Sequence, residues 1–162
     1  MSSFWDTSAI VPLMVDQPAS RDLRKWLAHD PGIVVWWGTP VEARSALARL
    51  MREGLLTDQE TQRAGARLSA LRRVWREILP SEQVRALAEE LPATHAVTAP
   101  DAFQVAAALL WCRERSRGRA FACVDQRLAT VAARIGFSVI PSAGRHASSR
   151  RDGFNPGHSL QQ

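Results

Sequence analysis

Short runs typical of buried strands alternate with amphipathic stretches along most of this chain. Residues 2–5, 33–37 and 120–124 are such runs, and residues 74–79 and 137–140 are predicted to form two further strands. Between them, apolar residues recur at the spacing of one helix face, which favours helices with a core-facing side. Strands that alternate with helices predict an α/β fold, here a three-layer sandwich around a central, mainly parallel sheet of four or five strands.

Two of the predicted helices have distinctive starts. Thr39 is expected to be the N-cap of the first, with Pro40 in its first helical position. The second begins at Pro100 and is apolar nearly all round to Trp111, so it is predicted to be the central buried helix. The core-facing stripe of the first helix comprises Ala43, Ala46, Leu47, Leu50 and Met51. The remaining helices are expected at residues 8–14, 18–28, 58–73, 81–91 and 128–135.

The length of 162 residues fits one domain with a substantial core. Residues 1–141 are predicted to form this domain, and residues 142–162, polar and without periodicity, are expected to be a flexible or partner-bound tail. No apolar stretch is long enough to span a membrane, and the N-terminus lacks the basic region of a secretory signal. Cys112 and Cys123 give no disulfide framework, which fits a cytoplasmic protein.

The net charge of +5 comes almost wholly from arginine, since Lys25 is the sole lysine. The planar guanidinium is suited to phosphate groups, so a polyanionic partner is one interpretation. A genomic preference for arginine over lysine explains the same charge equally well. The charge alone does not decide between these two explanations.

Four acidic residues occupy positions that solvation does not explain. Asp6 and Asp125 each follow a predicted buried strand at its carboxyl end. Glu42 and Asp101 each lie in the first turn of a predicted core-facing helix, shortly after a proline. In a parallel sheet these strand ends and helix starts share one edge, which is where ligands bind in such folds. We therefore expect the four carboxylates to converge on one site.

Each of these acids, taken alone, has a simpler explanation. A carboxylate in a first turn complements the helix dipole, and an aspartate after a strand commonly caps the next helix. Four such groups at one site repel one another unless a cation lies between them. Oxygen ligands favour Mg²⁺ or Mn²⁺ over zinc, and such ions activate water and stabilise the oxygens of phosphoryl transfer. The acids therefore predict a metal-dependent hydrolase that cuts phosphodiester bonds.

Four motifs stand in a characteristic order along the chain. They are Trp5-Asp6-Thr7-Ser8-Ala9, residues 34–42 (VVWWGTPVE), residues 95–110 around Pro100-Asp101-Ala102, and residues 121–133. Together they resemble the motifs of the PIN-domain endoribonucleases, in particular the VapC-type toxins of bacterial toxin–antitoxin pairs. The acidic quartet of that family falls on the four residues selected above: Asp6, Glu42, Asp101 and Asp125.

The resemblance implies an endoribonuclease that cuts structured RNA, commonly tRNA or ribosomal RNA, inhibits translation and is neutralised by a cognate antitoxin. It also implies a homodimer, and a small hydroxyl near the metal for which Ser8 or Thr7 is the match. Ser8 is equally well placed to cap the first helix. The sequence departs from the family at Cys123, where relatives often carry Thr or Ser, and at residues 97–100, where they often carry Leu-Arg.

Three further residues are candidates for contact with RNA. Arg44 and Arg49 lie on the predicted helix that carries Glu42, and phosphate contacts supply most non-specific affinity. His95 lies in the predicted loop ahead of Asp101. A solvated helix face and a loop histidine explain the three residues without RNA.

Two other functions fit parts of the sequence. In a haloacid-dehalogenase-like phosphatase an aspartate such as Asp6 also follows the first strand, but that class requires a second aspartate where Ser8 stands. A PIN-like RNA-binding or scaffold protein without catalysis needs no acidic quartet, and an unused cluster of carboxylates costs stability. The metal-dependent ribonuclease is therefore the favoured interpretation.

Overall fold

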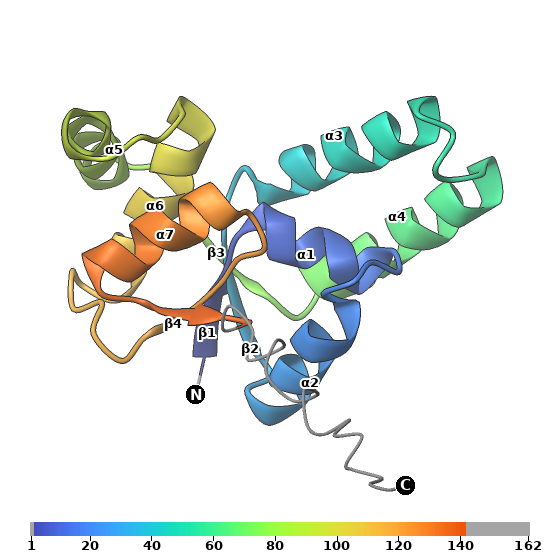
Figure 1. Ribbon diagram of the computed structural model, residues 1–162, viewed down its shortest axis with the longest axis horizontal. Helices are drawn as coiled ribbons and strands as arrows, with labels where there is room; N and C mark the ends of the chain where they lie inside the picture. The colour runs from blue at the N-terminus through green and yellow to red at the C-terminus, as the bar shows by residue number, and fades with distance from the viewer. Residues whose placement is uncertain (1, 142–162) are drawn as a thin grey trace, which may run out of the picture.

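Five parallel strands form the centre of the fold (Figure 1). The computed structural model describes residues 2–141. The strands lie in the order β3-β2-β1-β4-β5. Their bounds are β1 Ser2–Trp5, β2 Gly32–Trp36, β3 Arg76–Ile78, β4 Ala120–Ala122 and β5 Ser138–Ile140. The predicted parallel sheet is confirmed, and it has five strands, the larger of the two numbers expected from the sequence.

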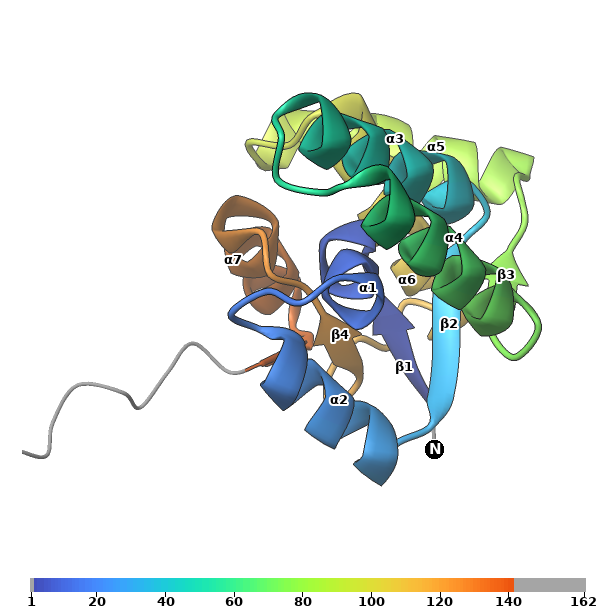
Figure 2. The same ribbon diagram turned by 90° about the vertical axis from the view of Figure 1, so that its right-hand side faces the viewer.

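Helices cover both faces of this sheet. One layer consists of α1 to α4 and the other of α5 to α7, as Figures 1 and 2 show from two directions. The helices are α1 Thr7–Met14, α2 Ser20–His29, α3 Thr39–Arg52, α4 Asp58–Arg72, α5 Glu82–Thr94, α6 Ala99–Trp111 and α7 Gln126–Ile135. The three-layer α/β sandwich expected from the sequence is therefore confirmed.

Alternation along the strands divides the core into two clusters. In β1, Phe4 packs into the cluster under α5, α6 and α7, and Trp5 packs into the cluster under α1 to α4. The same alternation separates Phe121 from Ala122 in β4. Both faces are apolar because helices cover both, which is why the strands read as continuous apolar runs.

Helix α6 is the most deeply buried helix of the second layer, as predicted. Ala102 and the residues from Gln104 to Ala108 are all buried. Helix α6 packs along α5 and against β2. This position brings the start of α6, with Asp101, towards the carboxyl ends of the strands.

Two predictions for α3 are wrong. The helix begins at Thr39, so Gly38 and not Thr39 holds the N-cap position. The Thr39 side chain is fully buried, with its Oγ1 3.3 Å from Gln104 Nε2, and Thr39 belongs to the helix itself. Met51 is 39% exposed because it lies in the last turn of α3, where α3 and α4 extend beyond the sheet as an antiparallel pair (Figure 1).

The strand order places a topological switch point beside β1. From β1 the sheet continues to β2 and β3 on one side and to β4 and β5 on the other. Ligands of open α/β sheets bind at the carboxyl ends of the strands where the order reverses. Asp6 and Asp125 follow the two strands that flank this point. The predicted tail at residues 142–162 lies outside the described residues, and within residues 2–141 no helix has the length and apolarity to cross a membrane.

Candidate active site

Asp6 is the most buried acid of the predicted quartet. It caps α1, where its Oδ2 accepts a hydrogen bond from the Ser8 backbone N–H at 2.9 Å, and it is only 4% exposed. Burial, with a smaller contribution from the negative charges of Glu42 and Asp101, raises the pKa of Asp6 to about 6 against the lowering effect of hydrogen bonds from Ser8. Glu42 and Asp101 therefore lie close enough to Asp6 for their charges to act on it.

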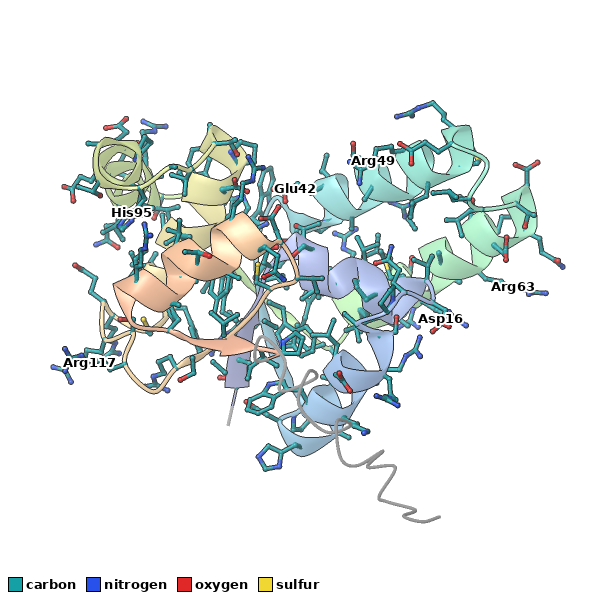
Figure 3. All side chains as sticks on the ribbon, viewed as in Figure 1. Asp16, Glu42, Arg49, Arg63, His95 and Arg117 are labelled. Carbon is teal, nitrogen blue, oxygen red and sulfur yellow. The ribbon has the colours of Figure 1, made fainter. Side chains whose placement is uncertain are left out.

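Glu42 lies in the first turn of α3 and is held by residues of two other helices. Its Oε2 accepts hydrogen bonds from the Thr7 hydroxyl at 2.6 Å and from Gln104 Nε2 at 2.9 Å. Thr7 belongs to α1 and Gln104 to α6, so this contact joins three helices. Figure 3 shows Glu42 near the centre of the molecule, where these helices meet.

Asp101 is held within the first turn of its own helix. Thr98 is the N-cap of α6, and its hydroxyl donates to Asp101 Oδ2 at 2.9 Å. The Thr98 backbone N–H lies 3.4 Å from the same oxygen. This reciprocal arrangement is a capping box, in which an acid in the third helical position bonds back to the N-cap residue.

Asp125 caps α7 and is linked to α1 through Ser8. Its Oδ1 accepts hydrogen bonds from the backbone N–H groups of Arg127 and Leu128 at 2.8 and 3.0 Å. The Ser8 hydroxyl oxygen accepts hydrogen bonds from the N–H groups of Val124 and Asp125 at 2.9 and 3.2 Å. The expectation that Ser8 caps α1 is wrong, because Asp6 takes that role and the Ser8 hydroxyl holds the loop after β4.

The four acids share one feature. Each uses one carboxylate oxygen to accept hydrogen bonds from the protein, and within residues 2–141 the other oxygen accepts none. The unused oxygens are Asp6 Oδ1, Glu42 Oε1, Asp101 Oδ1 and Asp125 Oδ2. No arginine or lysine in this part of the chain forms an ion pair with any of the four. The acids are therefore oriented by the protein, yet their charge is not neutralised by it.

These donors fit a hydrated divalent cation. Carboxylate oxygens are the ligands that Mg²⁺ and Mn²⁺ prefer, and Mg²⁺ commonly keeps several waters while binding one or two carboxylates. In the described part of the chain, no three His, Cys, Asp or Glu side chains stand close enough together to enclose an ion by themselves. An ion at these donors would therefore need water for most of its ligands.

Cys123 lies directly beside the quartet. Its Sγ is 3.6 Å from Ser8 Oγ and 3.8 Å from Asp6 Oδ2, and it is buried. Burial raises the pKa of the Cys123 thiol far above its usual range, with the charge of Asp6 adding to the effect. The thiol is therefore neutral and packs against Asp6 at the position where relatives of the resembled family often carry a hydroxyl.

Gln104 is absent from the residues that the sequence predicts for this site. It is 1% exposed, and its Nε2 lies within hydrogen-bond distance of Thr7, Thr39 and Glu42. One signal in the sequence points to it, because Gln104 is the one polar residue between Asp101 and Cys112. A polar side chain inside a buried helix requires partners.

Two of the residues predicted to contact RNA, Arg49 and His95, lie apart from Glu42. Arg44 and Arg49 are exposed on α3, and His95 is half-buried where α5 ends. In Figure 3, Arg49 lies farther along α3 than Glu42, and His95 lies on the other side of Glu42, near α5. Their role in binding RNA remains a prediction.

A family model described as the PIN domain matches residues 4–134. The chain belongs to the PIN domain family. The family-level resemblance seen in the four motifs is thereby confirmed, and all four acids lie within the matched residues. A comparison with curated proteins found no match.

Several solved structures share the PIN fold of this chain. VapC20 of Mycobacterium tuberculosis, described as a toxin that cleaves the sarcin–ricin loop, is 17% identical with a TM-score of 0.60, over 80% of this chain and 95% of that one. A toxin–antitoxin complex from Klebsiella pneumoniae matches at 17% identity and a TM-score of 0.55, over 80% and 92%. A Pyrobaculum aerophilum protein matches at 21% identity and a TM-score of 0.52, over 83% and 89%. At these identities the likeness shows the fold.

Proposed function

We propose that this PIN-domain protein is a metal-dependent endoribonuclease toxin that hydrolyses phosphodiester bonds in structured RNA, inhibits translation and is neutralised by a cognate antitoxin. The observation that carries the proposal is the set of four oriented, unneutralised carboxylates: Asp6, Glu42, Asp101 and Asp125. Membership of the PIN family supports nuclease chemistry at this edge of the sheet. VapC20, a structural relative, is described as a toxin that cleaves the sarcin–ricin loop, which favours RNA as the substrate.

The free oxygens of the quartet are the proposed ligands of Mg²⁺ or Mn²⁺. When bound, such an ion activates water as a nucleophile and stabilises the charge that develops on the phosphate oxygens. The chain's own contribution is to fix the acids before substrate arrives. Asp6, Asp101 and Asp125 are fixed by capping hydrogen bonds, and Glu42 is fixed by Thr7 and Gln104.

Burial also tunes Asp6 for this role. With a pKa of about 6 the carboxyl is mainly ionised at neutral pH, but at considerable cost, since burial and the neighbouring acids disfavour its charge. A cation at the unused oxygen would remove that cost. Ion binding and the relief of repulsion are therefore coupled at Asp6.

The phosphate backbone of RNA is proposed to lie along α3. Arg44 and Arg49 are exposed on this helix, which begins at the quartet with Glu42. Phosphate contacts of this kind position RNA without reading its sequence.

Partners and location follow from the proposed role. One structural relative is described as a toxin–antitoxin complex, which supports a protein antitoxin as the neutralising partner. A homodimer acting in the cytoplasm, where RNA and antitoxin are present, completes the proposal. Sedimentation of the purified full chain tests the dimer, since a monomer at micromolar concentration would contradict it.

A PIN-like scaffold protein without catalysis is the second candidate. The same fold would serve it, and the capping contacts of Asp6, Asp101 and Asp125 would then be purely structural. It offers no reason for Glu42 to be held by two other helices. A haloacid-dehalogenase-like phosphatase receives no support, because the chain belongs to the PIN family.

One incubation separates the two candidates. Purified protein is mixed with total RNA and Mg²⁺ or Mn²⁺, with and without EDTA, next to Asp6→Asn and next to Glu89→Gln, an exposed acid on α5 that serves as a control. We expect cleavage by the parent and by Glu89→Gln that EDTA abolishes, and none by Asp6→Asn. Cleavage by Asp6→Asn at the parental rate, or no metal-dependent cleavage by the parent, would contradict the proposal. Mapping the new 5′ ends would then identify the RNA.

A further inference from the structure

Gln104 is a polar residue in the most buried part of α6. It is 1% exposed, and the four residues that follow it, Val105 to Ala108, are each 0% exposed. An apolar side chain would pack at such a position without the cost of removing an amide from water. The presence of the amide is therefore explained only by the groups it contacts.

The amide nitrogen contacts the one acid of the quartet that is not held within its own helix. Nε2 lies 2.9 Å from Glu42 Oε2, 2.9 Å from Thr7 Oγ1 and 3.3 Å from Thr39 Oγ1. An amide nitrogen carries two hydrogens, so the two shorter contacts take them and the contact with Thr39 is the weakest. The Thr7 hydroxyl in turn donates to the same Glu42 oxygen at 2.6 Å.

The charge of Glu42 fixes the orientation of this amide. Gln104 Oε1 is buried and has no hydrogen-bond partner among the described residues. Turning the amide over would place Oε1 against Glu42 Oε2, and these two acceptors repel each other. An unpaired buried carbonyl is costly, so the orientation persists because the contact of Nε2 with the carboxylate outweighs that cost.

These contacts fix the Glu42 carboxylate and use only one of its two oxygens. Rotating the Glu42 carboxylate would break two short hydrogen bonds to Oε2, from Thr7 and from Gln104. Its Oε1, which accepts no hydrogen bond within residues 2–141, is therefore held in one place.

We propose that Gln104, acting with Thr7, is a positioning residue that aims Glu42 Oε1 at the cation of the nuclease site. The inference rests on the proposed function, because it assigns Gln104 a task in that same site. Partners that orient metal ligands typically change metal affinity or activity by roughly 10- to 100-fold when they are lost.

The primary test is Gln104→Met, which matches the length of glutamine and removes the amide. We expect the metal-free protein to remain folded, because the loss of the Nε2 contacts with Glu42 and Thr7 is partly offset by the removal of the unpaired carbonyl. The affinity for Mn²⁺, measured by electron paramagnetic resonance, should fall by roughly 10- to 100-fold, and kcat for RNA cleavage should fall similarly with KM little changed. Gln83→Met, at an exposed glutamine on α5, is the matched control and should change neither.

A double-mutant cycle tests whether Gln104 acts through Glu42. In a Glu42→Gln background, Gln104→Met should cause little further loss of Mn²⁺ affinity, because the group that it positions is already altered. Full additivity of the two losses would overturn the inference. Thr7→Val, which removes the hydroxyl and keeps the side-chain shape, should reproduce part of the loss and remains informative if Gln104→Met does not fold.

Failure of this inference is distinguishable from failure of the proposed function. If the parent binds Mn²⁺ and Asp6→Asn does not, the cation site stands. Unchanged Mn²⁺ affinity in both Gln104→Met and Thr7→Val would then overturn the positioning role alone. A parent that binds no Mn²⁺ would overturn both.

Discussion

Three acids of the quartet are held locally, whereas Glu42 is held from a distance. Asp101 and Asp125 bond only to groups within three residues of their own position in the chain, and Asp6 bonds mainly to Ser8, with Cys123 Sγ farther away at 3.8 Å. Glu42 instead depends on Thr7 and Gln104, which are 35 and 62 residues away in the sequence. The three aspartates make capping hydrogen bonds that would keep them in place without any function, but Glu42 makes none.

This difference shows which contacts are the stronger evidence for a functional site. Capping an N-terminus is worth about 1 kcal/mol, so a capping aspartate alone says little about catalysis. A buried glutamine and a threonine directed at one glutamate have no comparable local benefit. The Glu42 network therefore argues for a cation site more strongly than the capping contacts do.

The largest expected effect is on RNA cleavage. Asp6→Asn and Asp101→Asn keep the capping geometry, because asparagine accepts the same hydrogen bonds, but each removes a charge from the proposed site. Cleavage should fall by more than about 100-fold in each, beyond the range typical of groups that only orient a ligand. Single-turnover cleavage of RNA with Mn²⁺ measures this effect. If either variant cleaved RNA at the parental rate, that aspartate would have only a structural role as a helix cap.

A second expected effect is on stability and its dependence on pH. The pKa of Asp6 is raised from 3.8 to about 6, so the folded protein binds the proton more tightly than the unfolded chain. Stability is therefore lost as pH rises from 4 through 6, by up to about 3 kcal/mol for a shift of about two units. In EDTA at pH 7 or above, Asp6→Asn should unfold at higher denaturant than the parent, and at pH 4 the difference should vanish. Lower stability of Asp6→Asn at pH 7 would favour a purely structural role for Asp6.

A third effect separates capping from charge at Asp125. Asp125→Ala removes the acceptor for the N–H groups of Arg127 and Leu128, so the free energy of unfolding should fall by about 1 kcal/mol. Asp125→Asn retains an acceptor and should cost much less, while both variants should lose cleavage. Urea unfolding in metal-free buffer measures the difference. Equal stability of the two variants would show that the cap contributes nothing.

The smallest effect is expected on RNA binding at α3. Arg44→Ala and Arg49→Ala should each weaken binding uniformly across RNA sequences and reduce the salt dependence of affinity by about one unit of slope. Arg117→Ala, in the loop before β4, is the matched control because its charge lies away from α3. If the salt dependence of RNA affinity were unchanged in both α3 variants, the proposal that RNA phosphates contact this helix would be contradicted.

The sequence predicts the elements better than the contacts between them. Apolar runs predict the three inner strands β1, β2 and β4, because strands covered on both faces contain little else, whereas the edge strands β3 and β5 include the exposed Arg76 and Ser138. The caps at Asp6 and Asp125 follow the local rule for an aspartate after a strand, but the expected caps at Thr39 and Ser8 are wrong. The Thr39 hydroxyl contacts Gln104, 65 residues away in the sequence, and the Ser8 hydroxyl contacts Val124, 116 residues away. A local sequence pattern does not predict contacts over such separations.

The same limit applies to the site. The positions of the four acids follow from strand ends and helix starts, which local patterns predict. Which oxygen of each acid is occupied depends on packing, and the role of Gln104 depends on α6 lying against both α1 and α3. A polar residue inside an otherwise apolar helix is the one trace of this arrangement in the sequence.

We propose that Asp6, Glu42, Asp101 and Asp125 orient free oxygens towards one divalent cation. Mn²⁺ titration of the purified full chain, followed by electron paramagnetic resonance, tests it without RNA or turnover. We expect saturable binding by the parent, and a marked loss of affinity in Asp6→Asn and in Glu42→Gln but not in the control Glu89→Gln. Binding that is the same in all four proteins, or none in the parent, would contradict the claim.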